Sequence, residues 1–140
     1  MKILVAVDGS ELSLRAVKFV IALNRELAKP ARVTLLAVDP PHFPGVESRI
    51  GTKAVQQMHE DSLDQMLRDA RRSLSRAKLE LNERAEIGDA AETILAVARK
   101  EKVDLIVLGS HGRGAVKGIL LGSVSSKVIA QGDIPVTIVR

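Results

Sequence analysis

The segment from Asp104 to Ser125 constrains the fold of this chain more than any other part of it. Four consecutive apolar residues, Leu105 to Leu108, stand between an acidic residue and Gly109, which is typical of a short strand buried on both faces. A glycine-rich stretch follows, and Ser123 then opens a segment with apolar residues near helical spacing. A strand, a glycine loop and a helix N-terminus aim main-chain N–H groups and the positive end of a helix dipole at one point. Such an arrangement suits a phosphate.

The spacing of these glycines is more specific than their number. Gly109, two residues, Gly112, nine residues and then Gly122-Ser123 form the pattern G-x2-G-x9-G-[S/T]. Together with KILVAVDGS near the start and IPVTIVR at the end, this pattern resembles the ATP-binding branch of the universal stress protein family, and the likeness covers nearly all of the chain. Glycines that merely turn a strand into a helix remain the structural alternative.

Two other phosphate-binding motifs are absent. A P-loop needs Gly, four residues, Gly-Lys and then Ser or Thr, but the stretch from Gly118 to Ser123 lacks the lysine. The dinucleotide fingerprint should follow the first strand, where this chain has DGSELS. The sequence therefore favours a mononucleotide.

Length and composition favour one domain over residues 1–140. Hydrophobic residues make up 46% of the chain but aromatic residues only 1%, so the core is expected to be aliphatic, with Phe19 as its large side chain. The absence of cysteine excludes disulfides and thiolate metal sites. With neither a signal peptide nor a long apolar run, the sequence predicts a cytoplasmic protein that does not enter a membrane.

Strand and helix signals alternate along the chain. Strands are expected at Lys2–Val7, Arg32–Val38, Ala85–Gly88, Leu105–Leu108 and Ile134–Val139. Helices are expected from a Ser10 N-cap to Leu27, over Thr52–Leu81, from an Asp89 N-cap to Lys102, and over Ser123–Gln131. The third strand is short and charged, so we expect it at an edge. Pro40 to Gly51 is expected to be a loop that could act as a flap.

This alternation predicts an α/β fold, an open five-stranded parallel sheet of Rossmann-like type with helices on both faces. The family resemblance implies an adenine nucleotide alpha hydrolase-like fold with strand order 3-2-1-4-5. Strands one and four are then neighbours whose connections leave in opposite directions, and ligands bind in such sheets at that switch point. Asp8 and Gly109 both lie there, so topology and glycine spacing select the same site.

The resemblance also implies an ATP site residue by residue. Asp8, with Ala6 and Val7 beside it, would contact the adenosine, and the main chain of Val38 would read the adenine edge. The ribose and first phosphates would meet Leu108, Gly109 and Gly112, and the phosphates would meet Gly122, Ser123, Val124 and Ser125. Arg113 and Lys117 could reach the phosphates or be solvated loop charges. Asp8 could also serve only to start the turn into the first helix.

Few groups suited to catalysis accompany this site, and we assign no catalytic residue. No carboxylate lies between Gly109 and Asp133, so Mg²⁺ would be held through the phosphates and water, with Ser123 or Asp8 as further candidates. His111 lies inside the motif, where it could touch phosphate or act as a base. The other two histidines lack metal-ligand spacing with it, which argues against zinc.

Three functions are compatible with these features. The first is an ATP-holding stress or signalling module with slow or absent turnover, acting on protein partners that the sequence does not identify. The second is an ATP hydrolase or phosphotransferase at the same site, which would need charge neutralisation and a group that orients the nucleophile. The third is nucleic-acid binding through the basic run Arg68 to Lys78, but this run mixes both charges, the net charge is only +4, and no aromatic residue is free to stack on bases.

The last strand predicts self-association. Ile134 to Val139 is apolar and Arg140 is the last residue, so no tail is expected to cover the unpaired N–H and C=O groups of this edge. The resemblance agrees, because members of that family commonly form two-fold dimers through the last strand. Pro135 limits how far such pairing extends.

Overall fold

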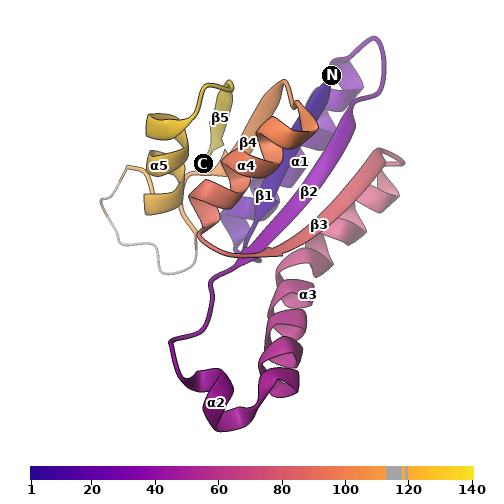
Figure 1. Cartoon of the computed structure of the whole chain (residues 1–140). Helices are drawn as coiled ribbons and strands as arrows, with labels where there is room; N and C mark the ends of the chain where they lie inside the picture. The colour runs from indigo at the N-terminus through magenta and orange to yellow at the C-terminus, as the bar shows by residue number, and fades with distance from the viewer. Residues whose placement is uncertain (113–117, 119) are drawn as a thin grey trace.

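The computed structural model describes residues 1–112, 118 and 120–140, and its five strands form one parallel sheet (Figure 1). The strands are β1 (Lys2–Val7), β2 (Arg32–Asp39), β3 (Glu80–Ile87), β4 (Leu105–Gly109) and β5 (Val136–Val139). Their order, β3-β2-β1-β4-β5, confirms the expected fold and strand order. β1 and β4 are therefore neighbours, and the C-terminal ends of all five strands lie at one edge.

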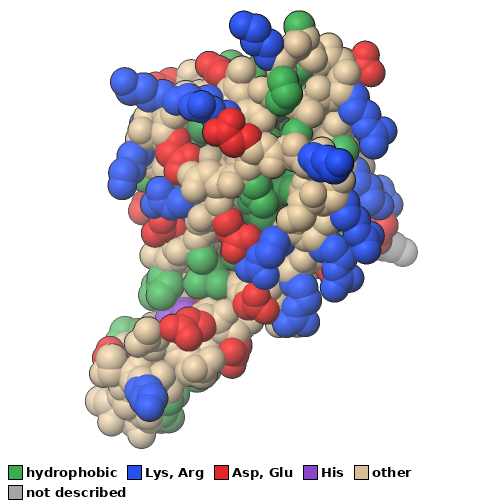
Figure 2. Space-filling model, turned by 90° about the vertical axis from the view of Figure 1, so that its right-hand side faces the viewer, with side chains coloured by type: hydrophobic (Ala, Val, Ile, Leu, Met, Phe, Trp, Pro, Cys, Tyr) green, Lys and Arg blue, Asp and Glu red, His purple; other side chains and the backbone are tan. Residues whose placement is uncertain are grey.

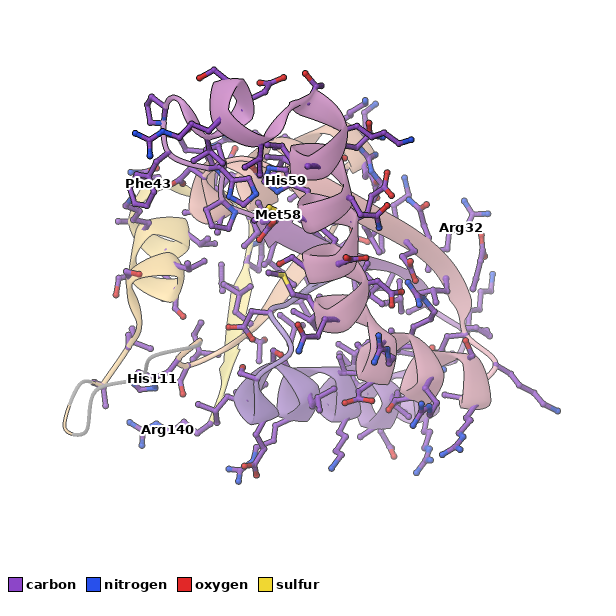
Figure 3. All side chains as sticks on the ribbon, turned by 90° about the horizontal axis from the view of Figure 1, so that it is seen from below. Arg32, Phe43, Met58, His59, His111 and Arg140 are labelled. Carbon is purple, nitrogen blue, oxygen red and sulfur yellow. The ribbon has the colours of Figure 1, made fainter. Side chains whose placement is uncertain are left out.

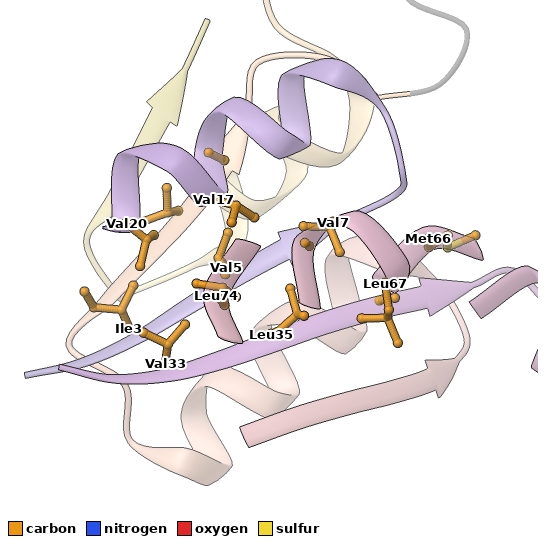
Figure 4. Close-up of a cluster of buried hydrophobic side chains, with 14 of the residues drawn as sticks. Ile3, Val5, Val7, Val17, Val20, Val33, Leu35, Met66, Leu67 and Leu74 are labelled. Carbon is orange, nitrogen blue, oxygen red and sulfur yellow. The ribbon is translucent and has the colours of Figure 1, made fainter. Parts of the chain in front are cut away.

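Helices cover both faces of the sheet (Figure 1). On one face lie α1 (Glu11–Glu26) and α3 (Thr52–Arg76), and on the other lie α4 (Ala90–Glu101) and α5 (Ser123–Gln131). Successive side chains of a strand point to opposite faces, so Ile3 and Val5 pack with α1 and α3, whereas Leu4 packs with α4. Figure 4 shows the first of these two layers, which is built from aliphatic side chains.

The expected N-caps of two helices are confirmed. The Ser10 side chain accepts a hydrogen bond from the main-chain N–H of Ser13 at 3.2 Å. The Asp89 carboxylate accepts one from the N–H of Glu92 at 3.0 Å. Each bond satisfies an N–H group that has no partner within its helix, which places the start of α1 and of α4.

The third strand is longer than the sequence predicts, and the helix before it is shorter. α3 ends at Arg76 instead of Leu81, and β3 spans Glu80–Ile87 instead of Ala85–Gly88. Leu81 continues the helical spacing of α3, but it packs on the core from the strand. The charges of β3 are paired: Arg71 on α3 donates two hydrogen bonds of 2.7 Å to the Glu83 carboxylate, which raises the pKa of the Arg71 guanidinium.

Three smaller expectations also need correction. Phe19 is 36% exposed on α1, and the fully buried side chains are aliphatic. β5 begins at Val136 instead of Ile134, because Pro135 has no N–H to donate to a ladder. The loop expected from Pro40 to Gly51 contains a short helix, α2 (Val46–Ile50).

The chain from Pro40 through α2 to the first turns of α3 projects from the sheet as an arm (Figures 1 and 2). Phe43 is 88% exposed on this arm, which corrects the expectation that no aromatic residue is free to stack, and Ile50 and Met58 are about half exposed. The arm leaves the sheet beside the C-terminal end of β2. Among the described residues, no helix is long and apolar enough to cross a lipid bilayer.

Candidate functional site

A cavity of about 610 Å³ lies at the C-terminal ends of β1, β2 and β4. Its volume falls in the range of about 300–1,000 Å³ that is usual for small-molecule sites. The structure brings together there eleven of the twelve residues expected to bind nucleotide: Ala6, Val7, Asp8, Val38, Leu108, Gly109, Gly112, Gly122, Ser123, Val124 and Ser125. The twelfth, Arg113, lies outside the described residues, as does Lys117.

The N-terminus of α5 forms one end of this cavity. Gly122 is the N-cap, so the N–H groups of the next three residues have no carbonyl within the helix to donate to. The N–H of Gly122 itself donates to the carbonyl of Ser110 at 2.7 Å. The first turn of α5 therefore directs main-chain donors and the positive end of the helix dipole at the cavity.

The two serines of this turn have different roles. The Ser125 hydroxyl is buried and donates to the main-chain oxygens of Gly109 at 3.0 Å and Ser110 at 3.3 Å. It therefore ties α5 to the end of β4, and Ser125 would offer a ligand only its main-chain N–H. Ser123 is exposed and lines the cavity.

Close packing constrains the three glycines of the motif to different degrees. None of them has a positive φ, so a left-handed backbone is not the reason for glycine at these positions. A Cβ at Gly109 would lie 2.9 Å from the carbonyl carbon of Leu12, and one at Gly112 would lie 2.5 Å from Asp8 Oδ2. A Cβ at Gly122 would lie 3.3 Å from the Cα of His111, so it would be crowded to a lesser degree.

Asp8 shapes the turn into α1 and also lines the cavity. Its Oδ1 accepts a hydrogen bond from the N–H of Ser10 at 2.9 Å, which shapes the turn into α1. Its Oδ2 lies beside Gly112, and the residue lines the cavity. Asp8 thus connects the end of β1 to the glycine loop.

A buried polar cluster at the end of β2 has no signal in the sequence. Asp39 lines the cavity, and its Oδ2 lies 2.6 Å from Nδ1 of His59 on α3. Its Oδ1 accepts a hydrogen bond from Ser62 at 2.9 Å. His42 stacks on His59 with ring centroids 4.3 Å apart. In Figure 3, His59 points from α3 toward the chain that leaves β2. The other lining residues that the sequence did not indicate are Ser13, Pro40, Met66, Ala90, Ile94 and Leu121.

The ionisable side chains among the described lining residues are Asp8, Asp39 and His111. The Nδ1 of His111 lies 3.1 Å from the hydroxyl of Ser110. No Lys or Arg lines the described part of the cavity, whereas the main-chain N–H groups and the dipole of α5 there can attract an anion. In the part of the chain that the structure describes, no three His, Cys, Asp or Glu side chains are grouped to hold a metal ion.

Comparison with known proteins gives consistent relatives over the whole chain. The sequence pattern of the universal stress protein family matches residues 1–140. Universal stress protein YxiE of Bacillus subtilis is 33% identical over 147 aligned residues, which span 99% of this chain and 98% of the relative.

Solved structures agree with this result. The structure of MJ0577 from Methanocaldococcus jannaschii superposes with a TM-score of 0.85 at 30% identity, over 99% of this chain and 94% of that one. The crystal structure of a universal stress protein in complex with cAMP superposes with a TM-score of 0.66 at 27% identity, over 100% of this chain and 96% of that one.

Proposed function

The chain belongs to the universal stress protein family, and on that premise we propose that it is an ATP-binding module of a cytoplasmic stress or signalling response, with slow or absent hydrolysis. The observation that supports ATP most strongly is the end of the cavity formed by the first turn of α5, where main-chain donors face the space beside Gly112 and Ser123. The relative in complex with cAMP supports an adenine nucleotide as the ligand.

The rest of the cavity fits the other parts of the nucleotide. The apolar side chains of Ala6 and Val38 offer a surface for adenine, with Val7 beside them in the lining, and β2 ends there with main-chain groups that could pair with the edge of the base. Leu108 and Gly109 lie between the two ends, where the ribose would be. Mg²⁺ would be held through the phosphates and water. The described residues contain no cluster of three or more His, Cys, Asp or Glu side chains that could hold the ion by themselves.

The same cavity argues for binding over turnover. Phosphoryl transfer needs cations around the transferred group and a residue that orients the nucleophile. The described lining contains no Lys or Arg, and His111 alone is placed near the phosphate end. An ATP hydrolase or phosphotransferase at this site remains the alternative, with His111 as its orienting group.

We also propose a homodimer through β5. This strand pairs with β4 on one side only and stands at the edge of the sheet, and each of its residues is partly exposed. Edge strands of this kind leave a row of N–H and C=O groups without ladder partners, and a second copy would pair with them.

The identity of the nucleotide released on denaturation tests the binding module. The purified protein is incubated with ATP and Mg²⁺, separated from free nucleotide and denatured, and the released compound is identified by chromatography. We expect intact ATP. Accumulation of ADP or AMP would favour the enzyme, and release of a flavin or of nothing would contradict both functions.

The proposed main-chain phosphate site predicts an order of effects. Ser123→Ala should weaken ATP binding about ten- to hundredfold, because it removes a hydroxyl donor to a charged group. Lys117→Ala should weaken ATP binding less than about fivefold, because a solvated charge contributes little to the binding of an anion. Calorimetric titration of both variants measures the order, and loss of binding in Lys117→Ala alone would contradict the proposal.

A further inference from the structure

Asp39, His59 and Ser62 form a buried hydrogen-bonded cluster at the C-terminal end of β2, and we call these three residues the β2–α3 clamp. One carboxylate oxygen of Asp39 lies 2.6 Å from Nδ1 of His59, and the other accepts a hydrogen bond from Ser62 at 2.9 Å. Asp39 is 7% exposed and His59 is 6% exposed. A carboxylate oxygen accepts hydrogen bonds, so the contact is satisfied with the ring nitrogen of His59 as the donor.

The clamp fixes two walls of the cavity relative to each other. Val38, directly before Asp39, lines the cavity from β2, and Met66, about one turn after Ser62, lines it from α3. The main-chain oxygen of Asp39 also accepts a hydrogen bond from the N–H of Gly88 at 3.0 Å, which ties the end of β2 to the end of β3. The end of β2 therefore cannot shift against α3 without breaking these bonds.

Stability alone is a poor reason for this arrangement. A buried carboxylate is costly unless it is fully hydrogen-bonded, and a well-packed apolar group at the same place often gives equal or greater stability. What a bonded polar group adds is a fixed geometry, because its bonds allow only a narrow range of positions. His42 covers one face of the His59 ring and limits the access of water to it.

We propose that the β2–α3 clamp is a positioning device that makes the cavity select its nucleobase. This inference rests on the proposed function, in which the cavity holds an adenine nucleotide with the base at Val38. Adenine and guanine differ in the donors and acceptors along one edge, and a rigid main-chain edge rejects the wrong base because its polar groups are left unpaired. A β2 end that could shift would accommodate both bases.

Titrations of ATP, GTP and inorganic tripolyphosphate separate selection of the base from binding of the phosphates. In the parent protein we expect ATP to bind at least about tenfold more tightly than GTP. His59→Leu, which removes the donor to Asp39, should lower this ratio at least about fivefold and leave the affinity for tripolyphosphate within about twofold. His59→Asn should restore most of the ratio, because its amide nitrogen lies about where Nδ1 does.

Two further variants complete the test. Ser62→Ala removes a single bond of the clamp and should lower the ratio about twofold to threefold, which keeps the test valid if His59→Leu does not fold. Gln57→Leu is the matched control, because it removes an exposed hydrogen bond to Asp61 on the same helix, and it should leave the ratio unchanged.

The outcomes distinguish the inference from its premise. An unchanged ATP-to-GTP ratio in folded His59→Leu or Ser62→Ala would show that the clamp is only a structural brace, and so would an equal loss of ATP and tripolyphosphate affinity. If the parent protein binds neither ATP nor tripolyphosphate, the proposed function fails and base selection fails with it. If it binds both and prefers ATP but the variants keep that preference, the function stands and the clamp proposal alone is wrong.

Discussion

A methyl group added at Gly109 would lie 2.9 Å from the carbonyl carbon of Leu12 and 3.0 Å from its oxygen. Both atoms belong to the main chain at the start of α1, which cannot yield as the end of a flexible side chain can. We therefore expect Gly109→Ala to lower the free energy of unfolding by about 1–3 kcal/mol, as overpacking does. Urea denaturation measures this.

Gly122→Ala is the comparison for this prediction. Its added Cβ would lie 3.3 Å from the Cα of His111 and 3.4 Å from the Ser110 oxygen, so a small shift of the loop would relieve the contact. The loss of stability should be smaller than at Gly109. Equal losses at the two positions would show that close packing is not what requires Gly109.

The two serines of the first turn of α5 should separate stability from binding. Ser125→Ala removes a buried hydroxyl that is shared between two main-chain oxygens, so the free energy of unfolding should fall by about 1–2 kcal/mol. Ser123→Ala alters an exposed hydroxyl, so it should change unfolding by less than about 0.5 kcal/mol while it weakens ATP binding. Chemical denaturation and calorimetry on the same samples test both. A large loss of stability in Ser123→Ala would contradict this division of roles.

At the scale of the elements, Asp89 at the start of α4 gives stability that depends on pH. The hydrogen bond from the N–H of Glu92, with a smaller contribution from Lys127, holds the pKa of the Asp89 carboxyl below its ordinary value of 3.8. A carboxyl whose folded-state pKa is lowered stabilises the fold above its unfolded-state pKa, and this stabilisation is lost as the pH falls through the folded-state value.

Asp89→Ala should therefore be less stable than the parent protein at pH 7, and the difference should shrink as the pH falls below 3.8. Urea denaturation of both proteins across this pH range measures the difference in their free energies of unfolding. The contributions of the other carboxyl groups are the same in both proteins and cancel in this difference. A difference that stays constant down to about pH 3 would show that the charge of Asp89 does not contribute to the cap.

The sequence predicted the elements whose apolar pattern is decided locally and missed those decided by distant contacts. The run Leu105 to Leu108 and the caps Ser10 and Asp89 can be read without knowing their surroundings. β3 cannot, because its exposed charges become compatible with a strand only when Arg71 of α3 pairs with Glu83. The helical spacing of Leu81 after Leu74 was also misleading, because the chain leaves the helix and turns at Lys78, whose φ is 54°.

The same distinction explains the candidate site. The glycine loop is contiguous in the sequence, so its spacing could be read directly. The β2–α3 clamp joins Asp39 to residues 20 and 23 positions further along the chain, and no spacing rule connects a strand end to the first half of a helix across a projecting arm. The role of Ser125 was missed because its acceptors, Gly109 and Ser110, lie on another element.

For the whole molecule, the proposed dimer predicts that a charge on β5 gives monomers. Val136→Lys or Ile138→Lys should abolish self-association, because a lysine at an apolar edge opposes strand pairing. Ile87→Lys is the matched control. Ile87 is 53% exposed and lies on β3, the strand at the opposite edge of the sheet. Light scattering of the protein at tens of micromolar measures its mass. A dissociation constant in that range corresponds to about 6 to 7 kcal/mol of association free energy. A monomeric parent protein at that concentration would rule out the dimer.

The close contact of Gly109 with the main chain of Leu12 also bears on how such a chain can evolve. A mutation to alanine there is removed by selection for folding, whether or not the cell needs the ligand. Gly112 is constrained less, because the atom that it faces is the end of the Asp8 side chain, which can move. A descendant that had lost the nucleotide would still inherit Gly109, whereas Ser123, which is exposed, would be free to drift. Among diverging copies of this fold, the serine is therefore a better record of past ligand binding than Gly109.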